Sequence, residues 1–124
     1  MKAEHRPAIT IRRVYEPPAP GEAPRWLVDG LWPRGLTKAA AGLAGWAKGA
    51  APSAVLRQWF GHKPQRFAKF RRRYFAELRE RPEATDVLMA AAHAGPITLV
   101  YAAHDETHNN AAVLREYLMG RAHA

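Results

Sequence analysis

Two groups of polar residues in the sequence have the types and spacing to carry chemistry. Asp29 lies near the end of the short apolar run RWLVDGL, Arg34 follows that run, and His108 lies in a polar group after the apolar run PITLVYA. Aspartate and histidine are common proton donors and acceptors. An arginine offers a planar fork that binds phosphate or carboxylate through two parallel hydrogen bonds. We therefore expect an anion-binding site, with Asp29 and His108 as the candidates for moving a proton.

Short strands separated by helices would position these residues. Residues 8–15 alternate in the manner of a strand, 25–31 suit a short buried strand, and 96–102 are typical of a central parallel strand covered on both faces. Helices are predicted over 38–48, 53–59, 64–81 and 85–94. A last helix, capped by Asp105 or Thr107, is predicted to run to Met119 with Gly120 closing it. This order predicts a small three-layer α/β domain with a short, mainly parallel sheet flanked by helices.

The candidate ligand site follows from this arrangement, because ligands bind beyond the carboxyl ends of the strands in open parallel sheets. Arg34 and the N–H groups at the helix start near Asn109 would hold the anion, and Trp32 would stack on the ligand. Arg71, on or beside the apolar face of the helix over 64–81, is a further candidate. The full set is Arg13, Tyr15, Asp29, Trp32, Arg34, Arg71, Tyr101, Asp105, His108, Asn109 and Asn110.

Two alternatives use the same residues differently. Asp29 could pair with a core arginine such as Arg71, and Asp105 could act only as a helix cap, so that the polar residues form a buried network in a scaffold without a ligand. A metal site at His104, Asp105 and His108 is the second alternative. Because no third dedicated ligand is obvious, we predict neither a metal nor a cofactor. Walker, GxGxxG, GxSxG and HExxH patterns are absent.

The charge of the chain suggests a second kind of function. The chain has 124 residues, a mass of 13.8 kDa and a net charge of +8. Residues 57–81 hold nine basic and two acidic residues, a net charge of +7. Such a segment could bind nucleic acid or an acidic protein as a non-enzymatic interaction module, or it could be a solvated helix face. We favour the small anionic or nucleotide-like ligand, because Phe67 and Phe70 share the inward face and are poorly placed to stack on bases.

Length and composition limit the remaining possibilities. The length fits one domain over residues 1–124, with tails expected at 1–7 and 121–124. The absence of cysteine excludes disulfides, thiolate zinc sites, iron–sulfur clusters and a cysteine nucleophile. The charged first seven residues do not read as a signal peptide, and no run approaches 18 apolar residues. We expect a cytoplasmic protein without membrane contact, and the sequence leaves its oligomeric state, its ligand and any reaction open.

Several longer motifs carry a family resemblance. They are RVY at 13–15, LVDGLWPRGL at 27–36, APS at 51–53, LR at 56–57, WFGH at 59–62, FRRRY at 70–74, YAAHD at 101–105 and HNNA at 108–111. On these the chain resembles the YeaO-like family, part of domain of unknown function 488. The resemblance implies a compact α/β fold and no particular activity. The chain departs from the pattern of this family at two positions. Gly30 stands where family members usually carry arginine, and His104 stands where lysine is common. Another arginine, such as Arg12, could substitute for the missing one.

Overall fold

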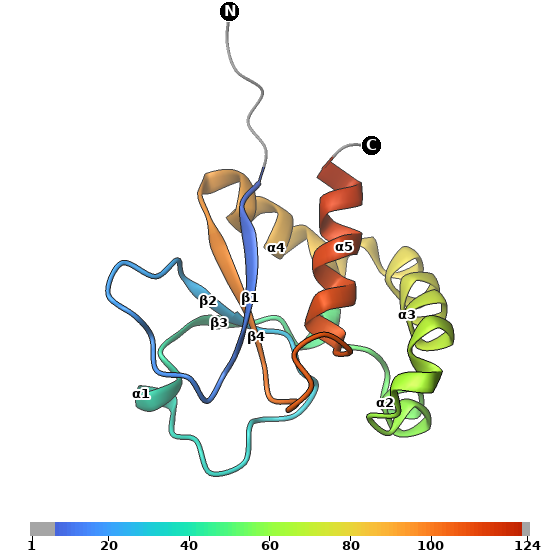
Figure 1. Cartoon of the computed structure of the whole chain (residues 1–124). Helices are drawn as coiled ribbons and strands as arrows, with labels where there is room; N and C mark the ends of the chain where they lie inside the picture. Colours follow the sequence, from blue (N-terminus) through green and yellow to red (C-terminus); the bar gives the residue numbers. More distant parts are fainter. Residues whose placement is uncertain (1–6, 123–124) are drawn as a thin grey trace, which may run out of the picture.

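The computed structural model describes residues 7–122, and a four-stranded parallel sheet lies at its centre (Figure 1). The strands are β1 (Ile9–Arg13), β2 (Arg25–Leu27), β3 (Leu43–Trp46) and β4 (Ile97–Tyr101), in the order β1-β4-β2-β3. β4 pairs with β1 on one side and with β2 on the other, and all its residues are buried. The continuous apolar run therefore forms the central strand, as predicted.

Helices cover one face of this sheet, and a thinner layer covers the other. The helices are α1 (Lys38–Ala41), α2 (Ala54–Phe60), α3 (Phe67–Glu80), α4 (Pro82–Ala94) and α5 (Asn110–Ala122), with 3₁₀ turns η1 (Lys48–Ala50) and η2 (Pro64–Arg66). The main core packs α2 to α5 against Ile97, Leu99 and Tyr101. On the opposite face Leu27 and Val100 lie in a smaller cluster, near α1 and the loops around it. The predicted α/β class is confirmed.

Local sequence signals explain where α2, α3 and α4 begin and end. The Ser53 hydroxyl accepts a hydrogen bond from the Leu56 N–H and caps α2, which ends at Gly61 in the left-handed conformation. Phe70 and Leu78 lie on the buried face of α3. Pro82 stops α3, as predicted. It also opens α4 at the first helical position, where proline is favoured, so the predicted start at residue 85 is three residues late.

The helix predicted over residues 38–48 is wrong beyond Ala41. Thr37 caps it as expected, but Gly42 adopts a left-handed conformation with φ 58° and ends it after one turn. The chain then continues as β3, paired in parallel with β2. Gly45 is required in this strand, because a Cβ there would lie 2.4 Å from the Trp26 ring. The two glycines that weaken the helix are therefore the residues that allow the strand.

The C-terminal part of the chain also differs from the prediction. Val87, expected to face inward, is 47% exposed. The last helix is capped by the Asn109 side chain, not by Asp105 or Thr107, and it continues past Gly120 to Ala122. Arg121 pairs with Asp86, so the predicted tail at 121–124 starts too early. At the other end Pro7 is buried, and the tail predictions for 1–6 and 123–124 lie outside the described residues. None of the helices described is long and apolar enough to span a membrane.

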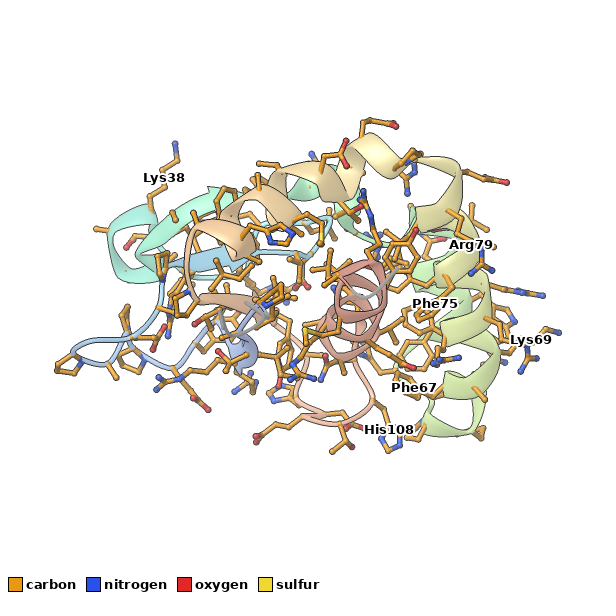
Figure 2. The ribbon with its side chains drawn as sticks, turned by 90° about the horizontal axis from the view of Figure 1, so that it is seen from above. Lys38, Phe67, Lys69, Phe75, Arg79 and His108 are labelled. Carbon is orange, nitrogen blue, oxygen red and sulfur yellow. The ribbon has the colours of Figure 1, made fainter. Side chains whose placement is uncertain are left out.

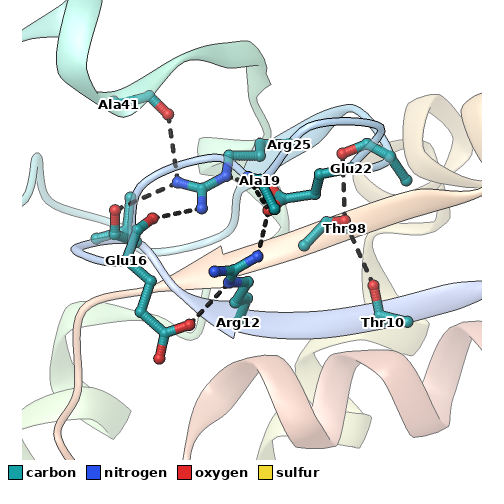
Figure 3. A network of polar contacts seen from close by, with 10 residues as sticks. Thr10, Arg12, Glu16, Ala19, Glu22, Arg25, Ala41 and Thr98 are labelled. Carbon is teal, nitrogen blue, oxygen red and sulfur yellow. Dashed lines mark hydrogen bonds and ion pairs between the residues drawn. The ribbon is translucent and has the colours of Figure 1, made fainter.

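A charged network fixes the proline-rich loop 16–24 to the sheet (Figure 3). Arg25 is 2% exposed, and its Nε donates to Glu22 Oε2 at 2.6 Å while Nη2 donates to the Glu16 carbonyl at 2.5 Å. Arg12 donates to the Glu16 and Glu22 carboxylates. Because both carboxylates already bind Arg12, this arginine is not free to replace the one that Gly30 lacks.

Candidate functional site

A cavity of about 760 Å³ opens beyond the carboxyl ends of β2 and β4, where the sequence places a site. Its wall comes from the segment after β2, from the segment between β4 and α5, and from α2 with the turn that follows it. The predicted residues that line it are Tyr15, Asp29, Trp32, Arg34, Asp105, Asn109 and Asn110. The structure thus brings together residues separated by about 80 positions in the chain.

Asp29 is the largely buried acid of this cavity. Its Oδ2 accepts a hydrogen bond from the Ala102 N–H at 2.9 Å, and its Oδ1 accepts one from Asn110 Nδ2 at 3.0 Å. Burial raises the pKa of Asp29, and these two hydrogen bonds, with the nearby His62 and Arg57, partly offset that effect. The carboxylate is consequently held in one orientation by donors from both ends of the segment that connects β4 to α5.

Two arginines give the cavity positive charge. Arg34 is exposed, and Arg57 places Nη1 beside Gly30, 3.6 Å from where a Cβ would stand. Within residues 7–122, neither guanidinium donates a hydrogen bond to another protein group or pairs with a carboxylate. Their donors are free for a ligand, which suits a phosphate or a carboxylate. Arg57, rather than Arg12, therefore puts a guanidinium next to Gly30.

His62 lines the same cavity from a strained position. It has φ 58° and directly follows Gly61, also left-handed at φ 53°. A left-handed backbone costs a residue with a Cβ on the order of 1 kcal/mol or more. Such outliers gather at ligand sites, where the surrounding structure imposes them. The strain turns the chain sharply after α2 and brings the imidazole to the cavity wall.

Aromatic side chains form the other side of the cavity. Trp32 donates from Nε1 to the Leu36 carbonyl at 2.6 Å, and its ring lies edge-on to Trp46 with centroids 5.6 Å apart. The Tyr15 hydroxyl donates to the Arg34 carbonyl at 2.9 Å and so fixes the loop that carries this arginine. These contacts hold Trp32 in place at the wall as a surface on which a planar ligand can stack.

The chain before α5 uses its own groups to satisfy the helix start. Asn109 is buried, and its Oδ1 accepts from the Ala112 N–H while its Nδ2 donates to the Asp105 carbonyl. The Asp105 carboxylate accepts hydrogen bonds from the N–H groups of Thr107 and His108, which hold the pKa of Asp105 well below its usual range. An anion expected at the start of α5 would thus compete with the Asn109 side chain, which caps the helix. The Asp29 carboxylate beside the helix start would also repel it.

Comparison with known proteins identifies the family. A family model described as the inactive DUF488-N3 subclade matches residues 8–124. The chain belongs to this family. It is 39% identical over 110 residues to the uncharacterized protein YeaO of Escherichia coli (strain K12), covering 89% of this chain and 96% of that protein. It is 35% identical over 113 residues to the uncharacterized protein Rv3073c of Mycobacterium tuberculosis (strain ATCC 25618 / H37Rv), covering 91% and 95%. No solved structure matches.

Four predicted residues of this DUF488-N3 member do not line the cavity. Arg71 forms a two-bond ion pair with Glu116 on the surface, so the alternative pairing of Asp29 with Arg71 is wrong. Tyr101 is buried in the core. Arg13 donates to the carbonyls of Ala102 and Ala103. His108 lies outside the cavity lining, with Nδ1 3.0 Å from Asp105 and its ring edge-on to Phe67.

The strand-end reasoning missed Arg57 and His62, which reach the DUF488-N3 cavity from α2 and the turn after it. Both stand in stretches that carry the family resemblance, and Gly61 before His62 was the local signal of a sharp turn. His104 lines the cavity too, at an exposed position. Within residues 7–122, no three histidine, aspartate or glutamate side chains are grouped so that they could hold a metal ion.

Proposed function

We propose that this DUF488-N3 protein is a cytoplasmic, non-catalytic binding domain for a small anionic ligand of nucleotide-like shape. The observation that carries the proposal is a single cavity that joins two unpaired guanidinium groups, those of Arg34 and Arg57, to an aromatic wall. The cavity volume of about 760 Å³ falls in the range typical of small-molecule sites. The ligand's anionic group would bind between the two arginines.

The other residues of the cavity set the orientation of the ligand. The Asp29 carboxylate repels an anion, so the charged group is expected where the Arg34 and Arg57 guanidinium groups outweigh that repulsion. The planar part of the ligand would then lie against Trp32, since an aromatic ring stacks on any base without needing a particular hydrogen-bond pattern. Asp29 can accept a hydrogen bond from an N–H group of the ligand.

Two facts favour binding without catalysis. The family model that the chain matches is described as inactive. In addition, both oxygens of Asp29 already accept hydrogen bonds from fixed protein donors, and His108 does not line the cavity. The two residues expected to move a proton are therefore poorly disposed to do so together.

A thermal-shift and calorimetric titration tests this proposal. The probes are inorganic phosphate, nucleoside 5′-monophosphates and the corresponding uncharged nucleosides. Nucleotides are expected to raise the Tm more than phosphate does, and nucleosides to have little effect. Arg34→Ala and Arg57→Ala should each weaken nucleotide binding tenfold or more, because a hydrogen bond to a charged group is worth about 1.5–3 kcal/mol.

The matched control is Arg79→Ala, which removes one exposed positive charge outside the cavity lining and should leave nucleotide binding unchanged. If none of the anionic probes raises the Tm, or if the Arg79 variant weakens binding as much as the Arg34 variant, the cavity is not an anion site.

A further inference from the structure

The outward side of α3 carries positive charges that form no ion pair with an acidic side chain among residues 7–122. Together with two cations of the turn that precedes this helix, these charges form the basic face, which consists of Lys63 and Arg66 from the turn and Lys69, Arg72, Arg73 and Arg79 from α3. Figure 2 shows Lys69 projecting from α3 on the side away from Phe67 and Phe75. Among the described residues, no member of the face forms an ion pair. Glu77 of α3 is turned away, since its carboxylate accepts hydrogen bonds from Ser53. Glu80, the other acidic residue of α3, is exposed at the end of the helix, so the net charge of the face stays strongly positive.

Three of these cations gather around one indole ring. The distances from the Trp59 ring centroid are 4.7 Å to the Arg73 guanidinium carbon, 5.2 Å to that of Arg66 and 5.9 Å to the Lys69 ammonium. Each contact with the ring is attractive, but the three like charges repel one another. A polyanion laid across the face would relieve this repulsion and release its own counterions. The arrangement therefore favours a partner with closely spaced negative charges.

The aromatic residues near the face are not available for stacking on bases. The Trp59 ring is occupied by cations, Phe67 lies against His108 and Phe60, and Phe75 lies edge-on to Tyr117. Proteins that bind single strands combine a basic groove with free aromatic platforms. Without such platforms the face offers contacts to phosphates alone, which favours a duplex of high charge density and predicts no sequence preference.

We propose that this basic face binds duplex DNA through the phosphate backbone, with α3 lying at the major groove. α3 stands at the edge of the molecule with its outer side uncovered (Figure 1), and its 14 residues make a helix about 21 Å long. The major groove of B-form DNA admits an α-helix, whereas the deep, narrow major groove of A-form RNA does not. This binding uses neither Arg34 nor Arg57 and is separate from the function of the cavity.

Fluorescence anisotropy with a labelled 20-base-pair DNA duplex of mixed sequence tests the proposal across a series of salt concentrations. The α3 variant is Arg72→Gln with Arg79→Gln, two exposed residues without hydrogen-bond partners among those described. The matched control is Lys38→Gln with Lys48→Gln, which removes the same charge elsewhere; Lys38 lies across the molecule from α3 in Figure 2. Circular dichroism confirms that both variants fold.

The expected result is binding that weakens steeply with salt. The α3 variant should bind at least tenfold more weakly at low salt, with the slope of log K against log salt reduced by about two, and the control should match the wild type. A 20-base-pair RNA duplex, single-stranded DNA and polyglutamate should each bind more weakly than duplex DNA. No DNA binding at low salt, equal loss in both variants, or tighter binding of RNA, single strands or polyglutamate would each overturn the assignment.

Discussion

Replacing Arg25 tests the network that fixes the loop between β1 and β2. In Arg25→Met the aliphatic part of the side chain is kept, but the Glu22 carboxylate and the carbonyls of Val14, Glu16 and Ala41 lose the guanidinium that donates to them. Removing one partner of a buried ion pair costs about 3–5 kcal/mol. Glu22 keeps its bonds to Arg12 and the Ala19 N–H, and methionine restores some apolar burial. The expected net loss is about 2–4 kcal/mol.

Urea denaturation measures this loss, because urea does not screen charge as guanidinium chloride does. The comparison is Arg71→Met, which breaks an exposed ion pair with Glu116 and should cost less than about 1 kcal/mol. Since a domain of this kind has about 5–15 kcal/mol of stability, the Arg25 variant remains largely folded, with a clearly lower midpoint. A cost for Arg25→Met no greater than that for Arg71→Met would show that the buried network contributes no more than a surface pair.

Two further substitutions address the cavity itself. Burial raises the pKa of Asp29, so the folded state holds this proton more tightly than the unfolded chain does. The contribution of Asp29 to stability is therefore greatest below the ordinary value of 3.8 and is lost as the pH rises through the raised pKa. Asp29→Asn should remove this pH-dependent contribution and lie within about 1 kcal/mol of the wild type at low pH, so the stability of the wild type relative to the variant should fall as the pH rises. Urea midpoints of both proteins from pH 3 to pH 8 check this, and a constant gap between them would refute it. Gly30→Arg should tighten nucleotide binding about threefold to tenfold in the calorimetric titrations, because the new guanidinium joins that of Arg57 at the cavity wall. The substitution fits the fold, since a Cβ at position 30 meets only ordinary contacts at 3.6 Å and 3.7 Å. Unchanged affinity in the folded variant would show that position 30 does not face the ligand.

The sequence was sufficient where a local signal and the tertiary structure agree. The apolar run at 97–101 contains no polar residue except Thr98, and such a strand is stable only when it is covered on both faces and paired on both edges. Ser53 and Gly61 bound α2 in the manner that capping predicts. The polar residues after the second and third predicted strands met at one edge for a purely topological reason, since the carboxyl ends of parallel strands lie together.

The sequence was insufficient where packing decides between two local possibilities. Residues 43–46 have neither clear helical nor clear strand periodicity, and the close approach of Trp26 to Gly45 selects the strand. The burial of Arg25 depends on the carbonyls of Val14, Glu16 and Ala41 as well as on the nearby Glu22 carboxylate, and the sequence does not indicate that these three carbonyls converge on it. Arg57 and His62 were missed because they reach the cavity from a helix and a strained turn, not from a strand end.

The basic side chains of residues 57–81 lie on different surfaces of the molecule. The two binding proposals therefore involve different residues and can be tested separately. Arg57 faces the cavity from α2, and Arg71 is neutralised by Glu116 beside the apolar side of α3. Lys69, Arg72, Arg73 and Arg79 share the outward side of α3, because residues three, four or seven positions apart lie on one face of a helix. A change in net charge alone would affect both kinds of binding, whereas the two proposals predict that cavity variants affect nucleotide binding and α3 variants affect DNA binding. Crossing the Arg57 and Arg72 substitutions in both assays therefore distinguishes two sites from one diffuse electrostatic field.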